Sequence, residues 1–458
     1  HRAAVQGFWA APSMAEKPGL KAVDMFRAVE DGRIKALWII CTNPAVSMPE
    51  ADRVAAAIKG CDFTVVSEMF GQTDTARLAH VLLPATGWGE KDGTVTNSER
   101  RISRQRRVLA APGQARDDWR ILAEVARRMG WGAAFSWESP AQIFAEYAAL
   151  SGIAGDLGSD FDISDHAGIS QEAYETLAPF LWPHSARKRG GRFFADGRFH
   201  TASGKARMVA VTPRPPQPLE AAYPFRLNTG RVRDHWHTMT RTGLSARLSG
   251  HLAEPFLELH PSDAARLGLA PAELACVTNP HGRALLRVLI TDRVAPGQPF
   301  APMHWTGETA PSGRIDALVP GLVDPVSGQP ASKSAPVAVS RFAAGWYGFA
   351  VSTRRFRPEC DYWAVAPLPN GQQAEMAGSH APADWIQTAQ AMFGVDSEPL
   401  VLRDDRRGLL RLAFYQDGQL RAALFLAPGP VGLSRSHIAA ALGTAAPGIL
   451  AGRPRSEE

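Results

Sequence analysis

Residues 36–86, ALWIICTNPAVSMPEADRVAAAIKGCDFTVVSEMFGQTDTARLAHVLLPAT, alternate short apolar runs with amphipathic ones. The pattern predicts elements in the order βαβαβ, at Ala36–Thr42, Pro49–Ile58, Phe63–Ser67, Thr73–Leu78 and His80–Leu83. That order is typical of a parallel sheet, because parallel strands are joined by crossover helices. Ligands of such sheets bind beyond the carboxyl ends of the strands. We therefore expect a site where three loops meet: Cys41–Pro44, Ser67–Glu68 and Pro84–Thr86.

The part of the chain after this sheet mixes helical and strand-like patterns. The elements predicted there are a hairpin at Gly93–Val108, a helix that starts near Asp117, a helix at Pro140–Ala149, a loop at Ser151–Asp165 and short strands with turns at Phe193–Val211. We assign residues 1–135 to a partial α/β domain. Residues 136–212 then form a mixed helical and β segment that completes its body.

A proline-rich stretch, TPRPPQP at Thr212–Pro218, separates this region from the rest. Proline removes backbone donors that helices and sheets require, so we place a domain boundary there. The elements predicted beyond it are strands at Phe225–Thr229, Ala275–Thr278 and Leu285–Ile290, a helix at Ser262–Leu267, and late strands at Leu409–Tyr415 and Arg421–Leu426. These patterns predict a β-barrel domain over residues 213–343 and a small α+β extension over residues 344–458.

The composition, with 45% hydrophobic and 21% charged residues among 458, is typical of a soluble protein of several domains. The longest apolar run, Ala36–Cys41, is far shorter than the roughly 20 residues that cross a bilayer. The four cysteines (Cys41, Cys61, Cys276 and Cys360) are too widely spaced for a disulfide framework, which favours a cytoplasmic location. The chain starts at His1 without a signal-peptide pattern, and we expect this end to be a cut.

A net charge of +5, with arginine in excess over lysine, favours anionic partners. The stretch Gly230–Gly243, GRVRDHWHTMTRTG, concentrates such chemistry, with two histidines, three arginines and three threonines. His235 and His237 could lie on one face of a strand and begin a metal site, but no third ligand stands nearby. We favour the alternative that they are barrel-strand histidines bonded to their neighbours.

Arginines are also dense in Glu99–Val108, where they could bind nucleic acid: Arg100, Arg101, Arg104, Arg106 and Arg107. No aromatic residue stands among them and no known nucleic-acid module surrounds them. We favour a solvated or domain-contacting hairpin face, and we expect no nucleic-acid partner.

Polar residues follow each of the three predicted strands of the parallel sheet. Asn43 could start a turn, Ser67 and Glu68 could cap a helix, and Lys91 could meet a phosphate. Each is ambiguous by itself. On three successive strand ends, however, they favour recognition of a nucleotide, with Glu68 able to accept from a guanine or a ribose hydroxyl.

Several motifs resemble the C-terminal half of molybdopterin-dependent oxidoreductases of the dimethyl sulfoxide reductase superfamily. They are WIICTNP at 38–44, LLPA at 82–85, EKDG at 90–93, NSERR at 97–101, residues 230–240 and DPVSGQP at 324–330. Two further motifs, MHWT at 303–306 and WYGFA at 346–350, are most similar to bacterial assimilatory nitrate reductases. The resemblance covers almost the whole chain.

The resemblance implies a barrel of the double-psi type and a cofactor, molybdenum bis(molybdopterin guanine dinucleotide). It matches Asn43, Ser67, Glu68, Lys91 and Asp118 to positions on the guanosine side. It matches one loop to the pterin pyrophosphate: Thr229, Gly230, Arg231, Val232, Arg233, Asp234, His235, Trp236, His237 and Thr238. The remaining matches are Trp305 near the pterin and the substrate route, Asp316 where relatives often carry Asn, and Lys333 as a second cofactor-binding lysine. Arg241 and His304 are candidates for a substrate funnel, but we favour the alternative that they pack in the core or against the cofactor.

The implied reaction is the two-electron reduction of nitrate to nitrite by oxygen-atom transfer, with no catalytic acid, base or nucleophile in this chain. The family's [4Fe-4S] cysteine motif and molybdenum-ligating cysteine are not in this sequence, so we expect a fragment, beyond which a [2Fe-2S] domain can follow. The implied partners are nitrate and an electron donor: ferredoxin, flavodoxin or an NADH-linked reductase. The alternatives are another bis-pterin enzyme, such as a formate dehydrogenase, or a non-catalytic scaffold subunit.

Overall fold

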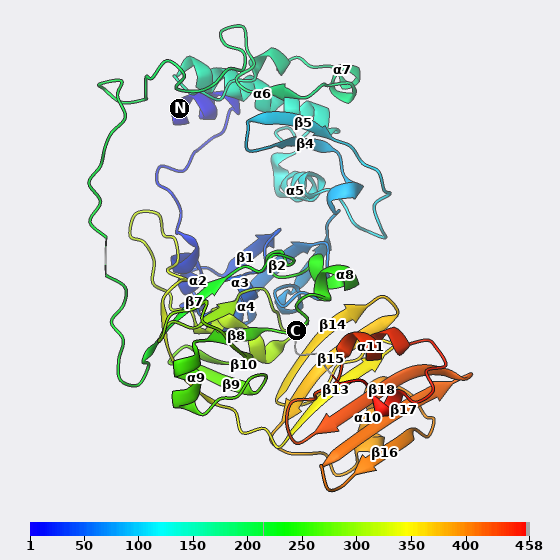
Figure 1. Cartoon of the computed structure of the whole chain (residues 1–458). Coiled ribbons are helices and arrows are strands. Elements are labelled where there is room, and N and C mark those ends of the chain that lie inside the picture. The colour runs from blue at the N-terminus through cyan, green and yellow to red at the C-terminus, as the bar shows by residue number, and fades with distance from the viewer. Residues whose placement is uncertain (214, 455–458) are drawn as a thin grey trace. The chain divides into compact units, whose positions relative to one another are not determined.

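The computed structural model describes residues 1–213 and 215–454, which fall into two compact units (Figure 1). Unit 1 takes residues 1–20, 67–69 and 82–213, and unit 2 takes residues 21–66, 70–81 and 215–454. The boundary between the units crosses strands β2 and β3. Among the described residues, no helix has the length and apolar character needed to span a membrane.

The sheet predicted from residues 36–86 is present, with strand order β1-β2-β3. Its elements are β1 (Ala36–Ile40), α3 (Pro44–Ser47), α4 (Ala51–Gly60), β2 (Phe63–Glu68), a 3-10 turn (Ala76–Leu78) and β3 (Val81–Pro84), preceded by α2 (Ala22–Glu30). Strand β3 runs parallel to β2, because the His80 amide donates to the Thr64 carbonyl and the Ala85 amide donates to the Glu68 carbonyl. The helix predicted at Thr73–Leu78 is reduced to the single 3-10 turn.

Unit 1 contains a second small sheet of order β4-β5-β6 and several helices. Its elements are α1 (Arg2–Phe8), a 3-10 turn (Trp88–Glu90), β4 (Gly93–Thr96), β5 (Arg101–Gln105), α5 (Asp118–Ala126), a π-type turn (Arg127–Trp131), α6 (Pro140–Asp156), a 3-10 turn (Ser164–His166), α7 (Gln171–Glu175) and β6 (Phe180–Leu181). The predicted hairpin is confirmed, since β4 and β5 pair antiparallel with Gly93 opposite Gln105. Apolar side chains of β5, α6 and α7, including Phe144 and Tyr174, form the core.

Two predictions for unit 1 are wrong. The loop predicted from Ser151 begins inside α6, because Gly152 and Gly155 do not end the helix. A Cβ at Gly152 would lie 2.7 Å from the Cβ of Ser164, and one at Gly155 would lie 2.8 Å from an oxygen of Asp162, so these glycines allow close packing. The strands predicted within Phe193–Val211 are also missing, and positive φ angles at Phe194, Gly197 and Gly204 interrupt an extended chain there.

The predicted β-barrel is present in unit 2 as a closed barrel of order β10-β8-β11-β7-β12-β9. Its elements are β7 (Phe225–Gly230), β8 (Phe256–Leu259), α9 (Pro261–Leu267), β9 (Leu274–Asn279), β10 (Gly282–Ile290), β11 (Phe300–Pro302) and β12 (Ala335–Arg341). The pairs β10/β8 and β11/β7 are parallel and the other four are antiparallel. The loops of the barrel carry α8 (Ala246–Ser249) and 3-10 turns at Thr242–Leu244, Pro311–Gly313 and Ile315–Leu318.

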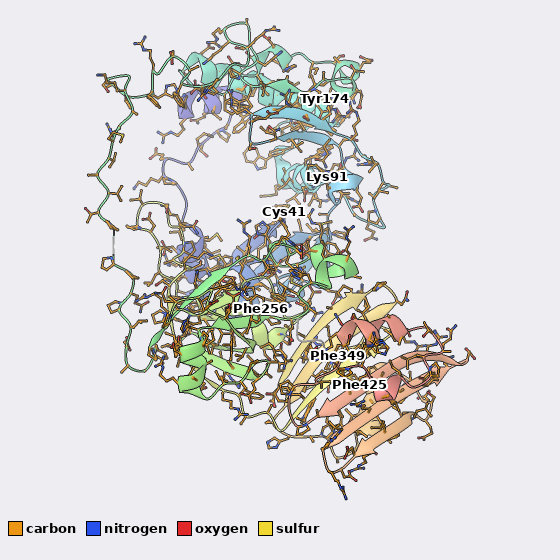
Figure 2. All side chains as sticks on the ribbon, viewed as in Figure 1. Cys41, Lys91, Tyr174, Phe256, Phe349 and Phe425 are labelled. Carbon is orange, nitrogen blue, oxygen red and sulfur yellow. The ribbon has the colours of Figure 1, made fainter. Side chains whose placement is uncertain are left out.

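The C-terminal part of unit 2 is an antiparallel sheet of order β14-β15-β13-β18-β17-β16 with two helices. Its elements are β13 (Trp346–Ser352), β14 (Tyr362–Leu368), β15 (Gly371–Gly378), α10 (Trp385–Phe393), β16 (Leu400–Asp404), β17 (Leu409–Gln416), β18 (Gln419–Ala427), α11 (Arg435–Ala441) and a 3-10 turn (Ile449–Ala451). Asp417 and Gly418 both have positive φ, as a tight hairpin turn requires. Phe349 and Phe425 pair across β13 and β18 in the core (Figure 2).

Candidate functional site

The loop Arg231–Arg241, here called the histidine loop, follows β7 without regular secondary structure. Strand β7 ends at Gly230, where a Cβ would lie 2.7 Å from the Phe300 ring. His237 and Met239 have positive φ angles of 40° and 60°, which turn the chain sharply. The hypothesis that both histidines lie on a barrel strand is therefore wrong, and the loop needs other contacts to fix its shape.

His304 supplies two of these contacts from inside the protein. Its side chain is completely buried, with Nδ1 2.7 Å from the His237 carbonyl oxygen and Nε2 2.9 Å from the Val232 amide nitrogen. Because a carbonyl can only accept and an amide can only donate, Nδ1 carries the proton. Burial lowers the pKa of His304, which favours this neutral form. The buried ring agrees with the favoured alternative for His304, packing in the core, and not with a place in an open substrate funnel.

His235 is also buried, and it packs edge-on against Trp305 with ring centroids 5.4 Å apart. Its Nε2 lies 3.2 Å from the Leu252 carbonyl and donates to it, which leaves Nδ1 as an acceptor. Neither His235 Nδ1 nor Trp305 Nε1 has a hydrogen-bond partner within the described ranges, although both are buried. Trp305 is 1% exposed, so its contact with a substrate stays a prediction.

Asn43, in the loop between β1 and α3, contacts the histidine loop directly. Its Nδ2 lies 3.2 Å from the Thr238 hydroxyl, and its Oδ1 accepts from the Thr75 hydroxyl at 2.6 Å. All three side chains are buried. The structure therefore joins a strand-end loop to the histidine loop, as expected if both serve one ligand.

The outer side of the histidine loop carries exposed donors. Arg231, Trp236 and His237 are exposed, whereas Arg233 is paired with Asp234 at 2.9 Å. A guanidinium and an imidazole that face solvent can donate to anionic oxygens. The loop thus combines a fixed backbone with free polar groups, an arrangement suited to binding a ligand.

Asp316 and Lys333 lie in the barrel loops near the base of the histidine loop. The Lys333 ammonium donates to the carbonyl of Thr229, near the end of β7 and just before that loop. Asp316 is 6% exposed, and burial raises its pKa to about 7 while the charge of Lys333 opposes the shift. A carboxyl group with this pKa carries a proton over much of the range in which a normal aspartate is ionised.

Replacing Asp316 by Asn should remove a pH dependence of stability. Between the normal pKa of 3.8 and about 7, folded Asp316 keeps a proton that the unfolded chain releases, so the free energy of unfolding falls as pH rises. The expected slope is up to about 1.4 kcal/mol for each pH unit in this window. Urea unfolding at pH 5.5 and 7 measures it, with the exposed Asp292→Asn as control. Equal slopes in the wild type and Asp316→Asn would contradict the assignment.

The site residues predicted in unit 1 gather around the ends of β2 and β3. Lys91 Nζ pairs with Asp118 Oδ2 at 2.8 Å, at the first turn of α5. Ser67 is buried. Glu68 is partly buried, and its carboxylate accepts a hydrogen bond from the Met69 amide. The Ala85 amide donates to the Glu68 carbonyl, which connects the two strand ends. The structure brings these residues to one edge of unit 1.

The arginines of the predicted hairpin are bound within unit 1. The Arg104 side chain is 1% exposed and donates to the Tyr174 carbonyl, and its guanidinium lies 3.9 Å from the Tyr174 ring centroid. Arg100 stacks on Phe193, and Arg107 pairs with Asp117. Charges that are already paired favour a structural role for this hairpin over a phosphate-binding surface.

Metal ligands do not gather in the described parts of either unit. In residues 1–213 and 215–454, no group of three or more His, Cys, Asp or Glu side chains is placed to hold a metal ion. Within the described ranges, none of the four cysteines forms a disulfide.

Two family models match this chain. Residues 4–128 match the molybdopterin oxidoreductase family, and residues 225–336 match the molybdopterin dinucleotide binding domain. The second match covers strands β7 to β11 and the start of β12, together with the histidine loop and Lys333. It covers Asp316 and Trp305 as well.

Curated relatives agree with these matches. The chain is 42% identical over 381 residues to a nitrate reductase of Klebsiella oxytoca, covering 83% of this chain and 44% of that protein. It is 32% identical to the assimilatory nitrate reductase catalytic subunit of Bacillus subtilis (74% and 47% covered). It is 34% identical to the F420-dependent formate dehydrogenase subunit alpha of Methanocaldococcus jannaschii (60% and 39% covered). The chain spans less than half the length of each.

Among solved structures, acetylene hydratase from Pelobacter acetylenicus has a similar fold. The TM-score is 0.54 at 20% sequence identity, covering 69% of this chain and 46% of that chain. At this identity the similarity concerns the fold alone. The family matches carry the assignment: residues 4–128 belong to the molybdopterin oxidoreductase family, and residues 225–336, which form most of the barrel, are a molybdopterin dinucleotide-binding domain.

Proposed function

We propose that this chain is part of an enzyme that reduces nitrate to nitrite in nitrate assimilation and holds molybdenum bis(molybdopterin guanine dinucleotide). The observation that carries the proposal is the histidine loop, whose backbone is fixed by His304 and whose Arg231 and His237 face solvent. The identity to nitrate reductases supports the choice of substrate.

The residues present fit such a cofactor. Buried His235 Nδ1 and Trp305 Nε1 are an acceptor and a donor without protein partners, as expected beside a polar ligand. Arg231 and Lys333 supply positive charge for phosphate or pterin oxygens, and Thr238 supplies a hydroxyl. At the strand ends of unit 1, Lys91 is paired with Asp118. If Asp118 binds a guanine instead, Lys91 is released to bind a second phosphate.

When bound, this cofactor supplies the redox chemistry by which an oxygen atom leaves nitrate. The residues of this chain hold and orient it and tune its electrostatics. His304 keeps the histidine loop in the binding conformation, and Asn43 keeps the β1 loop against Thr238. We assign no catalytic acid, base or nucleophile to this chain.

The same proposal extends to the parts of the enzyme that lie outside these residues. It includes a [4Fe-4S] cluster and a molybdenum ligand from preceding sequence, a [2Fe-2S] domain after it, a cytoplasmic location, and an electron donor such as ferredoxin, flavodoxin or an NADH-linked reductase. The match to this chain covers only 44% and 47% of the lengths of the two nitrate reductases, which supports a larger enzyme.

The test is to express the whole reading frame that encodes this chain in a molybdenum-replete host. We expect molybdenum and guanine nucleotide after acid release, and nitrate reduction with an artificial donor. A folded protein without molybdenum would contradict the proposal. Formate oxidation without nitrate reduction would favour the formate dehydrogenase alternative. The similarity to the formate dehydrogenase subunit of Methanocaldococcus jannaschii supports that alternative. Full cofactor content without either activity would favour a scaffold subunit.

Replacing Arg231 by Gln should lower the guanine nucleotide content of this protein about tenfold. The reason is the loss of one charge-assisted contact to an anionic oxygen, which contributes on the order of 1.5 kcal/mol. Arg406→Gln removes the same charge from an exposed position in the turn between β16 and β17 and should leave the content unchanged. Equal losses in both variants would indicate a nonspecific effect of net charge.

A further inference from the structure

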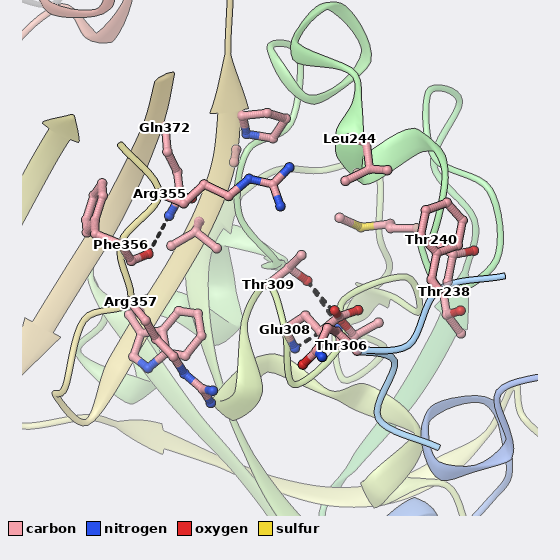
Figure 3. Close-up of a pocket in the computed structure, with 18 of the residues that line it drawn as sticks. Thr238, Thr240, Leu244, Thr306, Glu308, Thr309, Arg355, Phe356, Arg357 and Gln372 are labelled. Carbon is pink, nitrogen blue, oxygen red and sulfur yellow. Dashed lines mark hydrogen bonds between the residues drawn. The ribbon is translucent and has the colours of Figure 1, made fainter. Parts of the chain in front are cut away.

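Unit 2 contains a cavity of about 700 Å³ between the barrel loops and the C-terminal sheet, here called the arginine cavity (Figure 3). Its lining includes Arg77, Arg355, Arg357, Thr240, Thr309 and Gln372. The Val365 amide on β14 donates to the Thr309 carbonyl at 2.8 Å, so the two walls are joined by a hydrogen bond. Thr238, at the end of the histidine loop's cofactor-matched segment, also lines it, which places the arginine cavity beside the proposed cofactor site.

The arginine cavity has an excess of positive charge. Three guanidinium groups face one carboxylate, Glu308, among the described lining residues. Within residues 1–213 and 215–454, Arg77 and Arg355 form no ion pair, whereas Arg104 and Arg287 each pair with a carboxylate. Unpaired positive charges in a hollow attract small anions, because the protein walls focus the field there.

Arg355 is held in place by its neighbours on the loop between β13 and β14. Phe356 is buried against Phe393, and its carbonyl accepts from Gln372 Nε2 at 2.6 Å. Arg354 donates to the Gly394 carbonyl at 3.1 Å and so points elsewhere. Figure 3 shows the Arg355 side chain reaching from the sheet into the cavity toward the loop that carries Thr240 and Leu244.

The other lining groups select the kind of anion. Phe356 and Trp363 are among the lining residues, and the Arg357 guanidinium lies 5.2 Å from the Trp363 ring centroid. A guanidinium is planar and weakly hydrated, and it donates two parallel hydrogen bonds to a planar oxyanion. Apolar rings disfavour strongly hydrated anions such as phosphate, because these lose more solvation on entering.

We propose that the arginine cavity binds nitrate, with Arg355 as its hydrogen-bonding ligand and Arg77 and Arg357 providing the attracting charge. The choice of nitrate rests on the proposed function, but the binding of a planar oxyanion stands on the cavity alone. The site raises the local concentration of substrate beside the cofactor and takes no part in the chemistry.

Equilibrium dialysis of the 458-residue chain against isotopically labelled nitrate tests binding without the cofactor. We expect saturable binding that Arg355→Gln weakens about tenfold, as the loss of one charge-assisted bidentate contact implies. The matched control, Arg406→Gln, should change the affinity less than twofold. Phosphate should compete more weakly than nitrate. Equal nitrate binding by wild type and Arg355→Gln, or tighter binding of phosphate, would overturn the proposal.

Kinetics of the complete, cofactor-loaded enzyme give a second readout. Arg355→Gln should raise the KM for nitrate about tenfold with kcat unchanged, because the contact is lost before the chemical step. Its kcat/KM should also depend less on ionic strength than that of the wild type. An unchanged KM would contradict the role of the cavity in nitrate reduction.

The two proposals can fail separately. An enzyme that does not reduce nitrate, while the chain still binds nitrate through Arg355, would refute the proposed function and leave an oxyanion site. Nitrate reduction with a KM and a binding affinity that do not depend on Arg355 would refute the cavity proposal alone.

Discussion

His304→Ala is expected to lower the free energy of unfolding of unit 2 by about 3 kcal/mol. The substitution leaves the Val232 amide and the His237 carbonyl without their partner, at about 1–3 kcal/mol for each group that water does not reach. It also opens a space where a buried ring packed between His235 and Trp305. Urea unfolding followed by tryptophan fluorescence measures the loss.

Hydrogen exchange separates a local effect on the loop from global unfolding. In His304→Ala the Val232 amide should exchange on the order of 100-fold faster, as a loss of about 3 kcal/mol implies. Amides of β17 and β18 should accelerate by a similar factor if they exchange through unfolding of unit 2, whereas a change confined to the loop would leave them as in the wild type. His437→Ala, at an exposed position of α11, is the control and should leave both measurements unchanged. Wild-type exchange at Val232 in His304→Ala would show that the imidazole does not hold the loop.

Arg287→Met is expected to destabilise unit 2 by about 3–5 kcal/mol, the range found when one partner of a buried ion pair is removed. Arg287, on β10, lies 3.0 Å from Glu254 and 3.5 Å from Glu375 of β15, and it is 11% exposed. Burial raises the pKa of Glu254, whose carboxylate also accepts from the Tyr362 hydroxyl at 2.6 Å. Without Arg287, two carboxylates remain between the barrel and the C-terminal sheet with less compensation.

The comparison for Arg287 is Arg341→Met, since Arg341 pairs with Glu273 at a site where the arginine is 59% exposed. An exposed pair contributes less than about 1 kcal/mol. Adding Glu254→Gln to Arg287→Met should restore part of the stability, because one uncompensated charge is removed. A loss below about 1 kcal/mol in Arg287→Met would mean that water screens the network. Chemical unfolding of the four proteins decides between these outcomes.

The strands of the first sheet could be predicted because each is a local apolar run between turn-forming residues. The same local signal existed for α2, where Val23, Phe26 and Val29 are buried at helical spacing, but it was not recognised. Helix α3 is a single turn begun by Pro44, too short for any periodicity. Glycines misled the prediction in α6, since Gly152 and Gly155 serve packing against residues 162–164 and do not break the helix.

The residues of the histidine loop could be predicted from the sequence, but the tertiary hydrogen bonds that fix the loop could not. The dense stretch Gly230–Gly243 could be singled out from sequence, whereas its anchor, His304, is 67 and 72 residues away from its two partners. Thr75, which bonds Asn43, carried no signal either. The run TRRFRP at 353–358 has three arginines that look alike in sequence, and only tertiary contacts distinguish Arg354 from Arg355.

The neutral imidazole of His304 has a consequence for how fast a large cofactor can be taken up. The histidine loop contains two residues with positive φ, a shape that a free chain rarely visits. Because folding already fixes this shape, binding need not order the loop again, and the conformational entropy of about 1–2 kcal/mol for each residue is not lost at that step. Association can then proceed on a preorganised surface.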